Sequence, residues 1–383
     1  MTADTTPPKK AAFTRLSSRP IPRVARMMDA ATDLGFQAVF LAARREENLP
    51  KRESYAGHSV KRIGPYFPLL NGRSAWLYIR SVLAFNRDLY RELRELRPEI
   101  VHCSDIETMP AGVIYRVFFG TRLLYNIHDN LSQRYNILAS AQAALNYCEG
   151  VAVLLADQTL VPEKFRRDAL PSWCRKKVSV VRNTPADPGE AAPQPTNSGR
   201  VRLFFGGWLD QGRGLTELLS LVRENEDFEL KVAGEGAPEL IEKIKSNPRT
   251  SFLGFVTHEE IMAETALCHF VCALYNPVRP INRFAASNKL AEALACGRPV
   301  LVNSEMLITE TLSDYGCLVK LPFRDVQKSA AELMRQIVTA KPEAYRLMCL
   351  DARQAYQELY AWDVAMAGMY RALQGDETVR SEN

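Results

Sequence analysis

The chain has 383 residues, of which 46% are hydrophobic and 24% are charged. This composition is typical of a globular protein, and the length predicts two or more domains. No apolar run approaches the roughly 18 residues that a membrane-spanning helix needs, and the N-terminal sequence lacks the apolar core of a signal peptide. The eight scattered cysteines lack zinc-ligand spacing, so we expect reduced, mostly buried thiols in a cytoplasmic protein.

Positive charge is concentrated in the first half of the chain. Residues 1–190 carry 28 Lys and Arg against 19 Asp and Glu, whereas the remainder carries 21 against 25. A basic half suits an anionic partner: a phosphorylated acceptor, a membrane surface or nucleic acid. The alternative is a solvated basic face without a partner. We expect no nucleic acid, because the basic residues are spread and lack interleaved aromatic residues.

Strand and helix patterns alternate along the first half of the chain. Strand patterns occupy residues 11–16, 36–43, 98–105, 121–130, 150–157 and 177–183. Helix patterns occupy residues 22–34, 75–96, 110–120 and about 138–149, and the helix over 75–96 is long and amphipathic. This order predicts a parallel, doubly wound sheet.

A break in the pattern separates a second region of the same kind. Residues 185–199 are rich in proline and have no apolar period, which is typical of a linker. Strand and helix patterns then alternate again, and the stretch from Val326 is helical. We predict an N-terminal domain over 1–184, a linker over 185–199 and a second domain over 200–360. A final helix over 361–383 is expected to pack back on the first domain.

Ligands of such sheets collect at the carboxyl ends of the strands. The segments that fall there are HCSDIE (102–107), NIHDN (126–130), GGWLDQGRG (206–214), GEG (234–236) and the stretch SNKLAEALACGRPV (287–300). Two such edges facing one another would make a cleft, which is the usual ligand site. Neither a G-x-G-x-x-G dinucleotide fingerprint nor a G-x-x-x-x-G-K-[ST] phosphate loop is present.

Two segments of the second domain are candidates for anion binding. Arg213 lies beside a predicted helix N-terminus, where exposed amides favour anions; the alternative is a glycine turn with an exposed arginine. Lys289 and Glu292 are three residues apart on a predicted helix, so they either form a surface ion pair or point at a ligand. Ser287 and Asn288 are candidates to cap that helix and leave its amides open to phosphate.

The ordered set of segments resembles the GT-B-fold glycosyltransferases, especially the large retaining family 4. Three segments of the second half carry the resemblance: LFFGGWLDQGRGLTELL, LKVAGEG followed by FLGFVTHEEI, and SNKLAEALACGRPVLV. VHCSDIETMPAG, LLYNIHDN and ADQTLVP in the first half, and AWDVAMAGMYRAL near the C-terminus, resemble further family segments. The resemblance implies an α/β fold of two Rossmann-like, doubly wound domains that face a cleft.

The resemblance also implies roles for particular residues. Glu292 is expected to bind the ribose hydroxyls of a nucleoside-diphosphate sugar, and Arg213 and Lys289 to neutralise its diphosphate. His128 is expected to face the transferred sugar. The remaining residues expected around the donor are Gly206, Gly207, Gly234, Gly236, Phe255, Arg283, Ser287 and Asn288. The residues expected on the acceptor side are Arg15, Ser17, Ser18, Arg23 and Glu107, with Asp105 on the same edge.

The sequence departs from the family pattern at two positions. Many members have a Glu-x7-Glu motif, but Phe284 stands eight residues before Glu292. Gly207 stands where many members have an arginine, so Arg279 or Arg283 is a candidate for the second diphosphate contact. The first departure leaves the identity of the sugar open, and the nucleotide of the donor, UDP or GDP, is open as well.

The implied reaction requires stabilisation of a departing diphosphate. We expect Arg213, Lys289 and the helix start near Ser287 to supply it without a metal or cofactor, since no D-x-D motif is present where a metal site would lie. A retaining route, which the resemblance favours, needs no strong protein base. An inverting route needs a carboxylate, for which Asp105 and Asp129 are the candidates.

The expected acceptor is a saccharide, either lipid-linked or soluble. The basic half and the amphipathic helix over 75–96 suit docking on an anionic membrane to reach a lipid-linked acceptor, as in bacterial polysaccharide synthesis. The enzyme would then be peripheral at the inner face of the plasma membrane. Two other functions remain as alternatives: a nucleotide-sugar epimerase, and a non-catalytic GT-B binding subunit.

Overall fold

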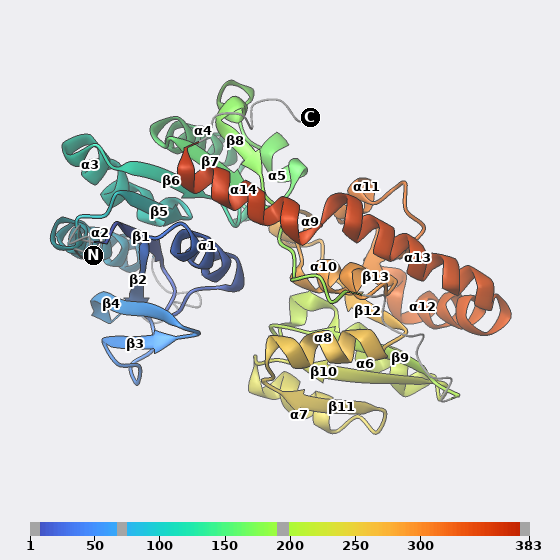
Figure 1. The fold of residues 1–383 in the computed structure, drawn as a ribbon. Coiled ribbons are helices and arrows are strands. Elements are labelled where there is room, and N and C mark those ends of the chain that lie inside the picture. Colours follow the sequence, from blue (N-terminus) through green and yellow to red (C-terminus); the bar gives the residue numbers. More distant parts are fainter. Residues whose placement is uncertain (1–7, 67–74, 190–198, 376–383) are drawn as a thin grey trace, which may run out of the picture. The chain divides into compact units, whose positions relative to one another are not determined.

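The computed structural model describes residues 8–66, 75–189 and 199–375 (Figure 1). The chain divides into two compact units. Unit 1 comprises residues 1–133, 137–182 and 366–383, and unit 2 comprises 134–136 and 183–365. Most of the predicted linker, residues 190–198, lies outside the described residues, so the predicted domain limits stay a prediction.

Unit 1 is built on one sheet. Its described strands are β1 Lys10–Arg15, β2 Gln37–Arg44, β3 Arg52–Tyr55, β4 His58–Tyr66, β5 Ile100–Ser104, β6 Arg122–Asn126, β7 Gln158–Val161 and β8 Val178–Val180. They are ordered β3-β4-β2-β1-β5-β6-β7-β8, and every neighbouring pair is parallel except β3 and β4. The prediction of a parallel, doubly wound sheet is confirmed for this unit.

The helices of unit 1 bury apolar stripes against this sheet. They are α1 Pro22–Asp33, α2 Ala75–Leu96, α3 Met109–Phe119, α4 Ala139–Leu155 and the short α5 Lys164–Asp168. Phe85 and Leu89 of α2, Tyr115 of α3 and Val153 of α4 share one core cluster with Val101 of β5. This spacing of apolar residues, three or four apart, is the reason why these segments form helices.

The strand predicted over residues 150–157 is wrong, because residues 150–155 are the end of α4 and residues 156–157 join α4 to β7. Glycine normally favours the end of a helix, but here Gly150 lies inside one. A Cβ at this position would lie 2.6 Å from the ring of Trp173, so the close approach of that side chain requires a glycine. The strand of this region is β7, which follows directly after α4.

The hairpin of β3 and β4 is an element that the sequence analysis did not predict. Its two-residue turn consists of Ala56, with φ 48°, and Gly57, with φ 81°. Positive φ at both positions is the geometry of the tight turns that join antiparallel strands. Through β4 the hairpin adds two strands to the edge of the sheet beside β2.

Unit 2 is built on a second sheet. Its described strands are β9 Val201–Gly206, β10 Phe228–Ala233, β11 Thr250–Gly254, β12 Phe270–Ala273, β13 Val300–Asn303 and β14 Leu318–Leu321. They are all parallel, in the order β11-β10-β9-β12-β13-β14. This is the Rossmann order, in which the connections reverse direction between the first and fourth strands of the domain, here β9 and β12.

The helices of unit 2 are mostly short. They are α6 Leu215–Glu224, α7 Pro238–Lys245, α8 His258–Leu267, α9 Pro280–Arg283, α10 Asn288–Ala295, α11 Ile308–Thr311, α12 Val326–Arg335 and α13 Pro342–Leu359. Leu218 of α6 and Met334 of α12 share the unit's core with Phe205 and Phe228 of the sheet. The alternation of strands and helices predicted for this half and the helical stretch predicted from Val326 are confirmed, and α9 and α11 are two further short helices.

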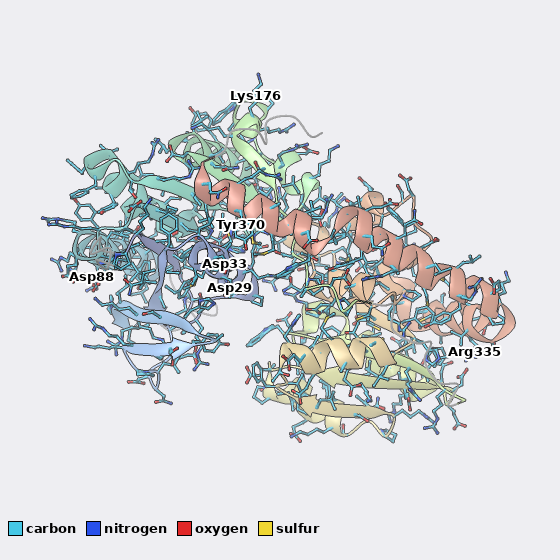
Figure 2. All side chains as sticks on the ribbon, in the orientation of Figure 1. Asp29, Asp33, Asp88, Lys176, Arg335 and Tyr370 are labelled. Atoms are coloured by element: carbon cyan, nitrogen blue, oxygen red, sulfur yellow. The ribbon has the colours of Figure 1, made fainter. Side chains whose placement is uncertain are left out.

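The last helix, α14 Trp362–Gln374, contacts unit 1 through its second half. Arg122 at the start of β6 donates two hydrogen bonds to the carbonyl of Ala372, at 2.9 and 3.1 Å. The Tyr370 hydroxyl donates to Asp33 of α1 at 2.7 Å, and Figure 2 labels both residues. The second half of α14 is therefore fixed by polar contacts within this unit.

No helix in the described ranges is both long and apolar enough to cross a bilayer. All eight cysteines are free thiols, and seven of them are buried. The prediction of mostly buried thiols is therefore confirmed.

Candidate functional site

The reversal of connections between β9 and β12 brings several predicted residues of unit 2 together. Gly206 ends β9, and Tyr275 follows β12 by two residues. The guanidinium of Arg213 lies over the Tyr275 ring at 4.6 Å, and the ammonium of Lys289 lies 5.4 Å from the same ring. Lys289 also lies 3.8 Å from the ring of Phe205 in β9. Two cations therefore share one tyrosine at this edge of the sheet.

The environment of this cluster is electrostatically unbalanced. Burial lowers the pKa of Lys289, which is only 8% exposed, and the nearby Arg213 charge lowers it further. Burial alone would raise the pKa of Tyr275, but the charges of Lys289 and Arg213 and hydrogen bonds with Ser287 and Arg213 lower it. Among the described residues neither cation forms an ion pair with a carboxylate. The cluster can thus accept an anion.

The alternative of a solvated surface ion pair between Lys289 and Glu292 is wrong. Both side chains are buried, as is every residue from Lys289 to Ala295. The salt bridge of Glu292 is to the exposed His258 at the start of α8, with Nε2 and Oε1 3.2 Å apart. Glu292 is thus positioned to accept hydrogen bonds at the same edge as the cations.

The predicted glycines of unit 2 lie where two loops meet through their backbones. A Cβ on Gly234 would lie 1.8 Å from the carbonyl oxygen of Gly207, and a Cβ on Gly236 would lie 2.0 Å from that of Leu209. The Gly207 amide donates to Ala233 and the Leu209 amide to Glu235. Glycine is therefore required here for loop packing, whatever the loops bind.

The segment over residues 276–284, which includes α9, lies beside the loop that carries Arg213. The amides of Asn276 and, more weakly, the side chain of Asn282 donate to the carbonyl of Gly212. Arg283 and Arg279 are exposed on this segment. Phe255, after β11, is 72% exposed, so its ring is available to a ligand.

The start of α10 differs from the predicted capping. Ser287 occupies the N-cap position, but its side chain makes no capping hydrogen bond, and Asn288 is the first helical residue. The Ser287 hydroxyl instead interacts with Tyr275. The first amides of α10 are therefore without a side-chain cap and adjoin the cationic cluster.

In unit 1, Asp105 links the ends of three neighbouring strands. Its carboxylate accepts from the Arg15 guanidinium at 3.3 Å and from the His128 amide at 3.0 Å. Its backbone has φ 62°, an uncommon value for a residue other than glycine. The other candidate base, Asp129, accepts from the buried Arg166 at 3.0 Å. Both predicted carboxylates are thus paired with arginines.

His128 lies two residues beyond β6 at the same edge. Burial lowers its pKa well below the usual value, and the charges of Arg15 and Arg23 act in the same direction. Its Nε2 atom is buried without a hydrogen-bond partner among the described residues. The imidazole is therefore neutral at pH 7.

The predicted acceptor residues lie in different environments. Arg23 is buried and donates to the Asn126 side chain at 3.0 Å and to the Val181 carbonyl. The Ser17 hydroxyl donates to the Arg19 carbonyl, and Ser18 is buried. Glu107 accepts from the Tyr78 hydroxyl of α2 at 2.7 Å. Arg23 and Ser17 thus have partners within the fold, and Glu107 connects the edge to α2.

Three polar residues at these edges were not predicted: Tyr275, His258 and Arg166. Tyr275 ends the apolar run HFVCALY (269–275), and its position two residues after β12 makes the end of that run a usable signal. His258 and Arg166 act through contacts with Glu292 and Asp129, distant in sequence, so no local pattern marks them. Within the described ranges no group of three or more His, Cys, Asp or Glu is arranged to hold a metal ion.

Comparison with known proteins agrees with this architecture. Residues 201–339 match the family described as glycosyl transferases group 1, and residues 23–184 match Glycosyltransferase Family 4. No curated protein matches the chain.

Solved structures of low sequence identity share the fold. Sucrose-phosphate synthase from Thermosynechococcus elongatus has a TM-score of 0.76 at 16% identity, covering 96% of this chain and 98% of the other. HepE from Anabaena, solved in complex with UDP-glucose, has a TM-score of 0.67 at 15% identity, covering 96% and 99%. The lipopolysaccharide outer core galactosyltransferase WaaB has a TM-score of 0.63 at 12% identity, covering 96% and 99%.

Two Rossmann-like units, each with polar residues at the carboxyl edge of its sheet, define a protein of the GT-B fold class. The two family matches together span most of the chain. The chain belongs to the family 4-like GT-B glycosyltransferases, and its activity is the transfer of a sugar.

Proposed function

We propose that the protein transfers a hexose from a nucleoside-diphosphate sugar to a saccharide acceptor, without a metal. The observation that carries this proposal is the pair of half-buried Arg213 and buried Lys289 around the buried Tyr275, without a carboxylate partner in the described ranges. Two cations beside uncapped helix amides suit a diphosphate. UDP is the proposed nucleotide of the donor, because the HepE structure was solved in complex with UDP-glucose.

The same cluster supplies the main chemical requirement of the reaction. As the bond from the anomeric carbon to the diphosphate breaks, negative charge develops on the departing oxygen. Arg213, Lys289 and the first amides of α10 are placed to stabilise this charge. Glu292 would accept hydrogen bonds from the ribose, and the exposed Phe255 would contact the base or the sugar.

The retaining route is the proposed stereochemistry. An inverting route needs a carboxylate to take the acceptor proton. The candidates Asp105 and Asp129 each already accept a hydrogen bond from an arginine of the same unit. In the retaining route the departing diphosphate oxygen takes that proton while the acceptor oxygen bonds to the anomeric carbon. The neutral His128 would then position the sugar rather than transfer a proton.

The proposed acceptor is a lipid-linked saccharide of bacterial polysaccharide synthesis, reached at the inner face of the plasma membrane. The basic first half of the chain supports an anionic acceptor or surface. Arg15, Ser18 and Glu107 would lie beside the acceptor at the carboxyl edge of the unit 1 sheet.

Nucleotide binding tests the donor part of this proposal. UDP at about 100 times its Kd should stabilise the protein by about 2.7 kcal/mol in thermal unfolding, and GDP should have a smaller effect. Arg213→Gln should weaken UDP binding at least tenfold, because a charge-assisted hydrogen bond is lost. Arg324→Gln, at an arginine whose side chain is 86% exposed in unit 2, is the matched control. No shift with either nucleotide would refute the proposal, and sugar isomerisation without an acceptor would indicate an epimerase instead.

A further inference from the structure

The outward side of α4 in unit 1 carries no charge. The helix is described over its whole length, and its one charged residue, Glu149, is buried. The Glu149 carboxylate accepts from the Leu131 amide at 3.0 Å and from the Tyr125 hydroxyl at 3.3 Å. A helix that covers a sheet normally presents charged residues to solvent on its opposite side. An exposed helix side without them is typical of an interaction surface.

Five exposed residues of α4 follow the spacing of a coiled-coil seam. They are Ala141, Ala144, Cys148, Val151 and Leu155, at intervals of three, four, three and four residues. This alternation places all five on one side of the helix, where coiled coils make their contacts. We refer to these five residues as the α4 seam. Val151 and Leu155 are 37% and 42% exposed, so the seam is open to a partner.

The seam is complementary to itself about Cys148. Its first half has the small residues Ala141 and Ala144, and its second half has the larger Val151 and Leu155. If two copies of α4 lie antiparallel with Cys148 at the centre, Ala144 faces Val151 of the second copy, and Ala141 faces Leu155 of the second copy. Small residues opposite large ones allow close packing. A two-fold contact requires this complementarity of a surface with itself.

The cations beside the seam do not oppose such a contact. Lys177 donates to the carbonyl of Leu154 at 2.8 Å. Arg116 of α3 donates to the carbonyl of Leu155 at 3.2 Å and pairs with Asp157. Both cations therefore have partners within unit 1 at the C-terminal end of α4. In an antiparallel pair the negative end of one helix dipole lies beside the positive end of the other, which is favourable.

The neighbouring α3 extends the apolar surface. Three residues on its outward side are 47%, 73% and 71% exposed: Ile114, Val117 and Phe118. The contact of Arg116 with the Leu155 carbonyl joins α3 to the C-terminal end of the seam. Apolar residues of α3 thus add to the area that a second copy can cover, and a stable contact buries about 1,000 Å² or more.

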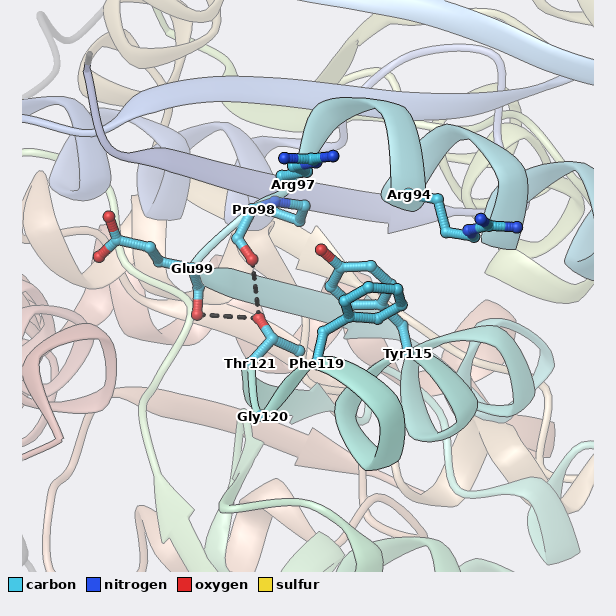
Figure 3. Close-up of a pocket in the computed structure, with 8 residues that line it drawn as sticks. All are labelled: Arg94, Arg97, Pro98, Glu99, Tyr115, Phe119, Gly120 and Thr121. Atoms are coloured by element: carbon cyan, nitrogen blue, oxygen red, sulfur yellow. Dashed lines mark hydrogen bonds between the residues drawn. The ribbon is translucent and has the colours of Figure 1, made fainter.

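The composition of α4 suits a second copy better than a bilayer. Helices that lie in a bilayer surface are rich in Lys and Arg on their polar side. The sequence of α4 contains neither. Arg94 and Arg97 line a pocket between the ends of α2 and α3, and they do not belong to the seam (Figure 3). An uncharged seam that matches itself therefore indicates a contact with another copy of the chain.

We propose that the protein forms a dimer through an antiparallel, two-fold pairing of the α4 seams of two copies. The contact is independent of the proposed sugar transfer. Cys148 lies at its centre and faces its equivalent in the second copy. All eight cysteines are in the described ranges, and Cys148 is the exposed one among them, which makes it a specific probe of this geometry.

Analytical ultracentrifugation of the full-length protein in reducing buffer tests the dimer. We expect the wild type to change from monomer to dimer between about 1 and 100 μM, as a contact of modest area does. V151E and A144K should each raise the Kd of the dimer at least about tenfold, because an unpaired charge would be buried. The double variant A144K/V151E should restore the dimer, because each introduced lysine then faces an introduced glutamate. L350E, at an exposed leucine of α13 in unit 2, is the matched control and should behave like the wild type.

Cross-linking at Cys148 tests the orientation of the two helices. A short bismaleimide, which joins two thiols, should give a covalent dimer of the wild type. C148S should give none, because the other seven cysteines are buried.

Three outcomes would overturn the proposed contact. A wild type that stays monomeric at about 100 μM would exclude the dimer. A dimer that V151E does not weaken, or that Cys148 does not cross-link, would place the contact elsewhere on the chain. A monomeric wild type that binds anionic vesicles, with binding lost in V151E, would show that a bilayer covers the seam. Recovery of the dimer in A144K/V151E separates a broken contact from a misfolded chain, because a second charge cannot refold a protein that the first has unfolded.

Discussion

Lys289 carries a charge that destabilises the unliganded fold. Its ammonium is buried against Phe205 and Tyr275, and burial lowers its pKa. Lys289→Met keeps most of the side-chain volume and removes the desolvated charge. We therefore expect an equal or higher melting temperature without ligand, and at least a tenfold loss of UDP affinity from the missing charge. Thermal unfolding with and without UDP measures both effects.

The combination of effects distinguishes a binding role from a structural one. A lysine retained for stability would give a variant with a lower melting temperature in the absence of UDP, contrary to this prediction. Lys328→Met, at an exposed lysine of α12, is the control and should change neither quantity.

Among the elements, the two glycine loops of unit 2 have the strictest steric requirement. Gly234 has φ 138°, and a Cβ would lie 1.8 Å from the Gly207 carbonyl oxygen. Gly254 also has positive φ, at 72°, but nothing lies within 4 Å of its Cβ position. We expect Gly234→Ala to lower the free energy of unfolding by about 3 kcal/mol or more, and Gly254→Ala by only about 1 kcal/mol.

Urea unfolding of the two variants compares the cost of a positive φ alone, at Gly254, with the cost of a positive φ and a steric overlap together, at Gly234. Equal effects would mean that the loops move apart at little cost, and that the close packing at Gly207 is not required. A larger effect at Gly234 would show that loop packing explains this glycine before any ligand is considered.

The predicted elements show which features a local pattern determines. The amphipathic period of residues 75–96 gave the bounds of α2, and the alternation after residue 200 gave the parallel sheet of unit 2. Residues 150–157 were predicted as a strand because an apolar run after a glycine fits either structure. The glycine at residue 150 is explained by the distant Trp173 ring, which leaves no room for a Cβ there, and not by the end of a helix.

The residues of the candidate site also form two groups, those that a local sequence pattern marks and those that only the fold brings together. Arg213, Lys289 and Glu292 were identifiable because they follow predicted strands in an order that resembles a known family. Tyr275 between the two cations and His258 beside Glu292 depend on side chains brought together by the sheet. The sequence thus located the sheet edge that carries the candidate site, whereas only the folded structure shows that two cations share the Tyr275 ring.

For the whole molecule, buried neutral histidines predict a loss of stability in mild acid. Burial lowers the pKa of His102 to about 3 and that of His269 to about 4, and it also lowers the pKa of His128. Between these values and about 6.5 the unfolded chain binds protons that the folded chain does not. Stability is therefore fully present above pH 6.5 and falls as the pH decreases, by up to about 1.4 kcal/mol per pH unit for each histidine.

His102 provides the sharpest test of this pH dependence, because its ring packs against Phe13 and neither nitrogen has a hydrogen-bond partner among the described residues. His102→Leu removes one titrating group without breaking a hydrogen bond, so we expect little change at pH 7 and higher stability than the wild type at pH 5. His269→Leu instead removes the acceptor of the Arg202 amide, at 3.0 Å, and should cost about 1–3 kcal/mol at pH 7 as well. Urea unfolding at both pH values separates the two cases.

Carboxylates held by arginines, such as Asp227 beside Arg335, lose their contribution to stability at a lower pH than the window in which the histidines titrate. An unchanged pH slope in His102→Leu would therefore show that the His102 imidazole is protonated or hydrated in the native state.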